Sequence, residues 1–114
     1  MTMDRKTYPI EIAGIYRELP LFEVQPGLRI AVLNILGDTE LVLACAKALD
    51  QELDGTNFDV IVTAEAKSIP LAHALSLEAD KPYIVLRKVY KPYMGNTIHA
   101  ETLSITTGKP QSLY

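Results

Sequence analysis

A short polar turn between an apolar run and a helical run holds the residues of this chain that are best placed for chemistry. The turn spans 63–68 and contains Lys67. Residues 58–62 before it form a β-branched apolar run of the kind that buried parallel strands show, and residues 69–77 after it have helical spacing. Ligands of open α/β sheets bind beyond the carboxyl ends of the strands, where backbone N–H groups of the next helix are free. The pattern therefore predicts an anion site, with Lys67 as an added cation.

The turn belongs to a predicted βαβ unit. A strand at 58–63 and a helix at 69–78 are followed by a second apolar strand at 83–87. Such units cross over right-handed almost without exception, and their strands read as continuous apolar runs when helices cover both faces of the sheet. We therefore expect an α/β fold with a parallel sheet flanked by helices.

A basic and aromatic segment follows the second strand. It contains Arg87, Lys88 and Lys91 and is interrupted by Pro92 and Gly95, which is typical of a long, mobile loop. On residue types alone these cations form either a ligand site or a solvated basic stretch, and the lysine of the earlier turn has the same two interpretations.

A β-rich region is predicted at the N-terminus. Three short alternating stretches at 8–15, 19–24 and 28–35 are separated by glycine and proline, so that residues 1–36 read as a small sheet.

A helix and a second β-rich stretch complete the chain. Asp38 is placed to cap a helix that runs to Leu53. Alternation returns at 101–106, and residues 108–110 form a turn before another strand begins.

Composition excludes several classes of protein. The 114 residues predict one domain over 1–114, with the core in 37–114, and 11 basic against 14 acidic residues give a net charge of −3, with no general attraction to nucleic acid or anionic membrane. No apolar run approaches the ~20 residues of a membrane span, so we expect a cytoplasmic protein. Cys45 falls in a helical apolar pattern and is interpreted as a structural thiol. No zinc-binding spacing, catalytic triad order or glycine-rich phosphate loop is present, and no metal ligands are predicted.

These features resemble the type I phosphoribosyltransferases, especially the purine enzymes that act on adenine. The resemblance rests on the order of the elements, the turn at 63–68, the Arg87-Lys88 pair and the loop at 91–96. It implies that the region at 1–36 is a hood over the base and that the turn, which in this family often contains a cis peptide, binds the pyrophosphate of phosphoribosyl pyrophosphate. The turn positions concerned are Ala64, Glu65, Ala66, Lys67 and Ser68.

The same resemblance implies roles for the later residues. Arg87, Lys88 and Lys91 would contact the pyrophosphate, with Lys88 neutralising the leaving group, and residues 89–100 would close as a lid. Glu101 is similar to the acidic residue that orients or protonates the base. Mg²⁺ would enter with phosphoribosyl pyrophosphate, and a homodimer is expected. For Glu65 two interpretations stay open, a cap of the following helix and a role towards metal-bound water.

One departure from the family is an absence. Its phosphoribosyl-binding signature, two acidic residues followed by a Thr-Gly-rich loop, is not found in 1–114. We therefore expect a partial domain with the C-terminal part of the core missing, inactive alone. The main hypothesis is a purine phosphoribosyltransferase, most simply for adenine. The alternatives are a ligand-sensing regulator, which would need an added DNA-binding domain, and a non-catalytic fragment.

Overall fold

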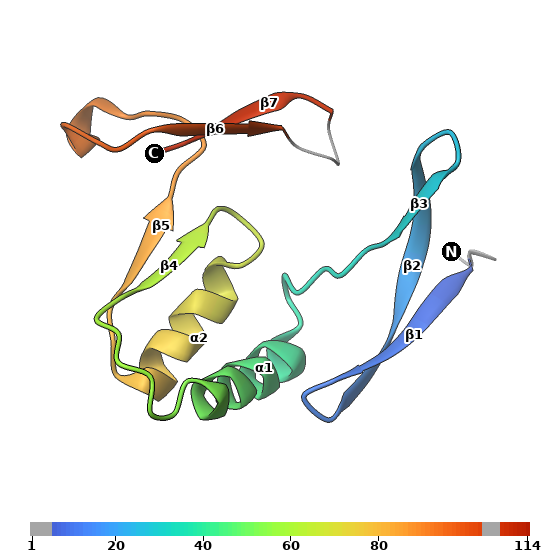
Figure 1. The fold of residues 1–114 in the computed structure, drawn as a ribbon. Helices are drawn as coiled ribbons and strands as arrows, with labels where there is room; N and C mark the ends of the chain where they lie inside the picture. Colours follow the sequence, from blue (N-terminus) through green and yellow to red (C-terminus); the bar gives the residue numbers. More distant parts are fainter. Residues whose placement is uncertain (1–5, 104–107) are drawn as a thin grey trace.

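The computed structural model describes residues 6–103 and 108–114, which fold into three small sheets and two α-helices (Figure 1). In chain order the elements are β1 (Thr7–Ile12), β2 (Ile15–Gln25), β3 (Leu28–Ala31), α1 (Thr39–Glu52), β4 (Ile61–Ala64), α2 (Ile69–Ala79), β5 (Tyr83–Leu86), the 3-10 helix η1 (Pro92–Met94), β6 (Ala100–Leu103) and β7 (Pro110–Leu113). The sheets are β1-β2-β3, β4-β5 and β6-β7, so the α/β prediction is confirmed with β4 and β5 as the parallel pair. Neither described α-helix is long and apolar enough to cross a membrane.

The first hairpin of the N-terminal sheet has a two-residue turn. β1 and β2 pair antiparallel up to Ile12 opposite Ile15. Ala13 and Gly14 form the turn with φ values of 51° and 81°, as the tight turns that match strand twist require. The single predicted stretch at 8–15 is therefore wrong, because the turn falls inside it.

β2 is long enough to pair on both sides, with β1 along its first half and with β3 along its second. The last bond to the β3 side runs from the Val32 N–H to the Pro20 carbonyl at 2.9 Å. Pro20 has no N–H with which to continue the ladder, so β3 ends at Ala31 and not near 35 as predicted.

Asp38 caps α1 as the sequence predicts, because its Oδ1 accepts a bond from the Leu41 N–H at 3.3 Å. Leu41 is only 1% exposed directly behind this cap. The main core lies between α1 and α2, where two alanines allow the helices to approach closely; it consists of Val42, Ala46, Ala74 and Leu75.

The parallel pair starts later than predicted. Ile61 is the first residue of β4, and its N–H donates to the Pro82 carbonyl at 3.0 Å. The pairing begins at Ile61 opposite Tyr83, and residues 58–60 pair with no strand among the described residues, so the predicted start at 58 is wrong.

Only one face of this pair is covered in the described part of the chain. Ile61 packs on the core with α2, whereas Val62 and Ile84, which pair with each other and point to the other face, are 55% and 52% exposed. The expected burial on both faces is therefore wrong, since both α-helices lie on the same side of the pair (Figure 1).

The C-terminal hairpin β6-β7 lies beyond the carboxyl end of β5 (Figure 1). It is attached there by two backbone bonds, from the Arg87 N–H to the Tyr114 carbonyl at 2.9 Å and from the Tyr114 N–H to the Arg87 carbonyl at 2.8 Å. The predicted alternation at 101–106 is confirmed as far as Leu103, and 104–107 lie outside the described residues. The predicted turn at 108–110 is one residue too long, because β7 already begins at Pro110.

Candidate anion-binding site

The predicted anion turn lies between β4 and α2 and has free donors. The Glu65 N–H donates a hydrogen bond to the Leu86 carbonyl at 3.0 Å, which connects the start of the turn to the end of β5. Ala66, Lys67 and Ser68 are exposed, and within the described residues their backbone N–H groups donate to no protein acceptor. Free N–H groups at the start of a helix are the donors that bind anions.

The backbone of the turn has the predicted irregularity. The peptide bond between Glu65 and Ala66 is cis, inside the interval from Ala64 to Lys67 where the resemblance places one. Ala64 is the last residue of β4 and is half-buried opposite Leu86.

The carboxylate of Glu65 joins the turn to the segment after β5. Its Oε1 accepts a bond from the Lys88 N–H at 2.6 Å and one from Arg87 Nε at 3.4 Å. These contacts, with the Lys88 N–H first, lower the pKa of Glu65. The helix-cap interpretation of Glu65 is therefore wrong: the N-cap of α2 is Ser68, which makes no side-chain cap bond.

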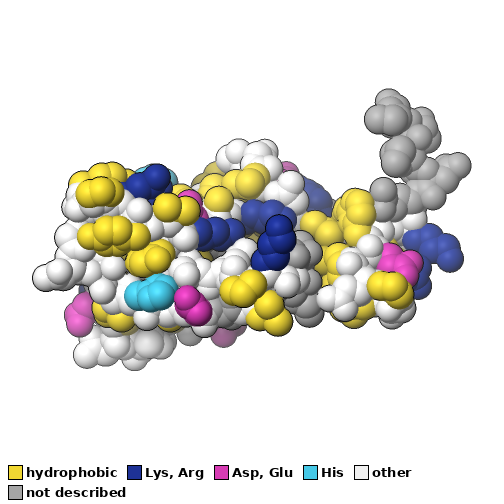
Figure 2. All heavy atoms as spheres, turned by 90° about the horizontal axis from the view of Figure 1, so that it is seen from above, with side chains coloured by type: hydrophobic (Ala, Val, Ile, Leu, Met, Phe, Trp, Pro, Cys, Tyr) yellow, Lys and Arg dark blue, Asp and Glu magenta, His cyan; other side chains and the backbone are white. Residues whose placement is uncertain are grey.

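Positive charge gathers on the same two loops. Lys67 and Lys88 are exposed and Lys91 is half-buried, and none of the three forms an ion pair in the part of the chain that the structure describes. Figure 2 views this end of the molecule and shows Lys and Arg side chains near the middle of the face. The Tyr93 hydroxyl and the Glu65 carboxylate raise the pKa of Arg87. The three lysine charges thus have no compensating carboxylate among the described residues, whereas Arg87 is paired with Glu65.

Other predicted residues lie away from the turn. Glu101 is exposed on β6, and no contact joins its side chain to the turn among the described residues. His73 meets the edge of the Tyr83 ring at 5.6 Å and His99 stacks on Tyr114 at 4.7 Å, so both histidines have aromatic packing partners.

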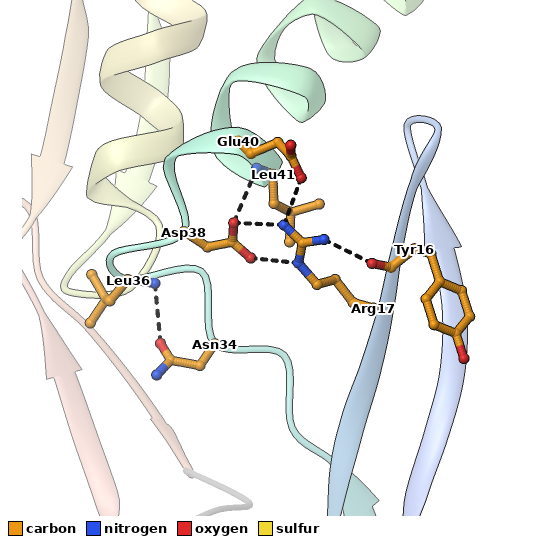
Figure 3. Close-up of polar contacts among 7 residues, drawn as sticks. All are labelled: Tyr16, Arg17, Asn34, Leu36, Asp38, Glu40 and Leu41. Carbon is orange, nitrogen blue, oxygen red and sulfur yellow. Dashed lines mark hydrogen bonds and ion pairs between the residues drawn. The ribbon is translucent and has the colours of Figure 1, made fainter.

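A second charged cluster was not predicted (Figure 3). Arg17 of β2 donates from Nε to Asp38 Oδ2 at 2.9 Å and from Nη2 to Asp38 Oδ1 at 3.0 Å. Its Nη2 also meets Glu40 Oε1 at 3.0 Å. The Arg17 bonds lower the pKa of Asp38, which sequence patterns identify only as a helix cap. No local pattern pairs residues 21 positions apart in the chain, so this link between the N-terminal sheet and α1 had no signal in the sequence.

No group of three His, Cys, Asp or Glu side chains that could hold a metal ion is found among the described residues. At the turn, Glu65 is already engaged by Arg87 and Lys88. A divalent cation at this site would therefore be coordinated chiefly by oxygens of the bound anion and not by protein side chains.

Comparison with known proteins gives relatives in purine metabolism. The chain is 44% identical over 64 residues to a hypoxanthine/guanine phosphoribosyltransferase of Methanotorris igneus, over 55% of this chain and 35% of that protein. It is 25% identical over 103 residues to the purine biosynthesis transcriptional activator PurR of Lactococcus lactis, over 90% of this chain and 37% of that protein. No family model matches. The chain thus spans about a third of the length of these curated relatives.

The fold has a solved counterpart. The crystal structure of adenine phosphoribosyltransferase from Thermoanaerobacter pseudethanolicus superposes with a TM-score of 0.58 at 20% identity, covering 83% of this chain and 55% of that one. Its likeness concerns the fold, while the sequence relatives carry the family name. In sequence the chain is similar to purine phosphoribosyltransferases, and in fold it resembles a type I phosphoribosyltransferase.

Proposed function

We propose that this chain supplies the pyrophosphate-binding half of a purine phosphoribosyltransferase, which transfers ribose 5-phosphate from phosphoribosyl pyrophosphate to a purine base and releases pyrophosphate. The observation that carries the proposal is the meeting of two loops at the carboxyl ends of β4 and β5. One loop has free N–H groups at 66–68, the other has Arg87 and Lys88, and Glu65 links them. The similarity to hypoxanthine/guanine phosphoribosyltransferases supports the same function.

The chemistry of the site follows from charge. When the purine nitrogen bonds to the anomeric carbon, the bond from that carbon to the pyrophosphate oxygen breaks and negative charge grows on the leaving group. Donors and cations that are already in position stabilise this charge without reorganising. Lys67 and the N–H groups of the turn would hold the pyrophosphate from one side, and Arg87 and Lys88 from the other.

Mg²⁺ supplies further neutralisation of the pyrophosphate when it is bound. Because Glu65 is engaged by Arg87 and Lys88, the ligand oxygens would be its principal donors. Pyrophosphate binding by this chain should therefore strengthen with Mg²⁺, while Mg²⁺ alone should bind weakly.

The remaining roles concern the base and the assembly. We propose that residues 89–100 close over the site, that Lys91 adds a contact to the pyrophosphate and that Glu101 orients the base, in a homodimer. Adenine is the base that the sequence resemblance favours. Since several relatives are named for hypoxanthine and guanine, a binding assay must offer all three bases.

The decisive experiment is calorimetric titration of the chain with pyrophosphate, with and without Mg²⁺. Replacing Lys67 by glutamine should weaken binding about tenfold, since a lost contact with a charged ligand costs ~1.5 kcal/mol or more. The matched control is Lys47→Gln, an exposed lysine on α1 for which no ion pair is found in the described residues. Equal affinity of the two variants, or no pyrophosphate binding by the unchanged chain, would contradict the proposal.

A ligand-sensing regulator is the second candidate, favoured by the match of 90% of the chain to PurR. Both candidates require anion binding at the turn, so binding does not separate them. Conversion of adenine, hypoxanthine or guanine to the mononucleotide by the complete gene product would separate them, because a sensor binds phosphoribosyl pyrophosphate without turnover.

A further inference from the structure

The carboxylate of Glu65 holds donors that an incoming anion needs. Oε1 of Glu65 accepts from the Lys88 N–H at 2.6 Å and from Arg87 Nε at 3.4 Å. The side chain of Glu65 is 25% exposed and that of Arg87 is 39% exposed, so solvent reaches both groups. The protein's own anion therefore lies where one side of the pyrophosphate site is expected.

The first two backbone donors after β5 are already bonded within the protein. The Arg87 N–H is bonded to the Tyr114 carbonyl at 2.9 Å and is not available. The next N–H, that of Lys88, is bonded to Glu65 and to no backbone acceptor among the described residues. Displacement of one carboxylate would therefore free both a backbone donor and the Nε of Arg87.

The two halves of the site thus differ. The N–H groups of Ala66, Lys67 and Ser68 are open, whereas the donors of Arg87 and Lys88 are held by a side chain that is tethered to the turn. A tethered group competes at a high effective concentration, so a ligand must offer more than one replacement contact to displace it.

We propose that Glu65 is a specificity-determining residue, a tethered competing anion that pyrophosphate displaces readily and single phosphate displaces poorly. Pyrophosphate can bind the open half with one phosphoryl group while its second group replaces the carboxylate. Inorganic phosphate has one group for both tasks. This inference rests on the proposed function and refines it, because it assigns the choice between diphosphate and monophosphate to one side chain.

Two substitutions of Glu65 test the inference by calorimetry with pyrophosphate and inorganic phosphate. Glu65→Gln removes the charge at nearly constant size, and Glu65→Asp keeps the charge but shortens its reach to Lys88. Both variants should bind phosphate about tenfold more tightly and pyrophosphate about threefold more tightly, the range expected for removing one partly exposed charged competitor. The preference for pyrophosphate should therefore shrink about threefold in each.

The outcomes separate this inference from the function it rests on. If the unchanged chain binds pyrophosphate and both variants keep the same preference, the inference alone fails. A gain in Glu65→Gln without a gain in Glu65→Asp also overturns it, because general charge repulsion would then suffice. No binding of either anion by any of the three proteins overturns the proposed function as well.

A measurement on the unchanged chain covers variants that do not fold. In amide NMR spectra, the Lys88 resonance should shift on addition of pyrophosphate at much lower concentration than on addition of phosphate. The Lys67 amide, which is already open, should respond to both anions. A Lys88 amide that stays unchanged while the Lys67 amide responds to pyrophosphate would show that Glu65 is not displaced.

Discussion

Two arginine–carboxylate contacts in this molecule differ in geometry. Arg17 places Nε and Nη2 on the two oxygens of Asp38, at 2.9 Å and 3.0 Å. Arg87 reaches Glu65 with a single bond of 3.4 Å. Each contact connects a strand, or the residue after it, to the segment that starts the neighbouring helix.

The difference separates a structural joint from an exchangeable contact. The Arg17 fork engages both oxygens of Asp38, which also caps α1, so three donors hold this carboxylate in place. For Glu65 the foremost cause of its lowered pKa is the Lys88 N–H, followed by the charge and the side-chain bond of Arg87. The Lys88 N–H and Arg87 could therefore bind a ligand anion in place of the Glu65 carboxylate without unfolding the protein.

The largest loss of stability near the Arg17–Asp38 contact is expected when the buried side chain next to it is shortened. Leu41 follows the Asp38 cap and is 1% exposed. Leu41→Ala should lower the free energy of unfolding by about 3 kcal/mol, within the usual range for a buried leucine. Urea unfolding measures this, with Leu77→Ala as the matched control, since Leu77 is 72% exposed on α2 and should change stability by less than about 0.5 kcal/mol. If Leu41→Ala and Leu77→Ala lowered the free energy of unfolding equally, burial of Leu41 beside the Asp38 cap would not contribute to stability.

Replacing the Asp38 charge tests the joint by pH. Asp38→Asn keeps an oxygen for the cap but loses the charged fork, and should lower the thermal midpoint at pH 7 by several degrees. The pKa of Asp38 is lowered in the folded protein. A lowered pKa contributes stability that is present above the ordinary value of ~3.9 and is lost as the pH falls through the folded value.

Acid titration of thermal stability therefore compares the two contacts directly. Below about pH 4 the unchanged chain should lose stability more steeply than Asp38→Asn. The pKa of Glu65 is also lowered, so Glu65→Gln should flatten the same region. Its effect should be smaller, because only one oxygen of Glu65 is engaged. A larger effect for Glu65 than for Asp38 would reverse the comparison.

Local patterns in the sequence predicted the elements that depend on neighbouring residues. Asp38 as a cap, the helix at 69–78 and the cation-bearing turn all follow from spacing within a few residues, and the structure has each of them. The predicted start of β4 is wrong because the strand begins where the Ile61 N–H reaches the Pro82 carbonyl, just before β5.

Distant partners account for what the sequence did not reveal. Arg17 and Asp38 are 21 positions apart, and Glu65 and Lys88 are 23 positions apart. The turn could be predicted as an anion site from its own residues. That one of its side chains already serves as the anion depends on the packing of two loops, which no short-range pattern encodes.

The smallest expected effect sharpens the comparison most. Glu40 gives Arg17 a third contact at 3.0 Å, but its side chain is 68% exposed, against 25% for Asp38. Solvent screens such a pair, so Glu40→Gln should change the free energy of unfolding by less than about 0.5 kcal/mol in urea titrations. If Glu40→Gln instead destabilised the chain as much as Asp38→Asn, net charge around Arg17 rather than the fork would hold the joint. The difference between the Arg17 and Arg87 contacts would then come from the number of carboxylates around each arginine and not from hydrogen-bond geometry.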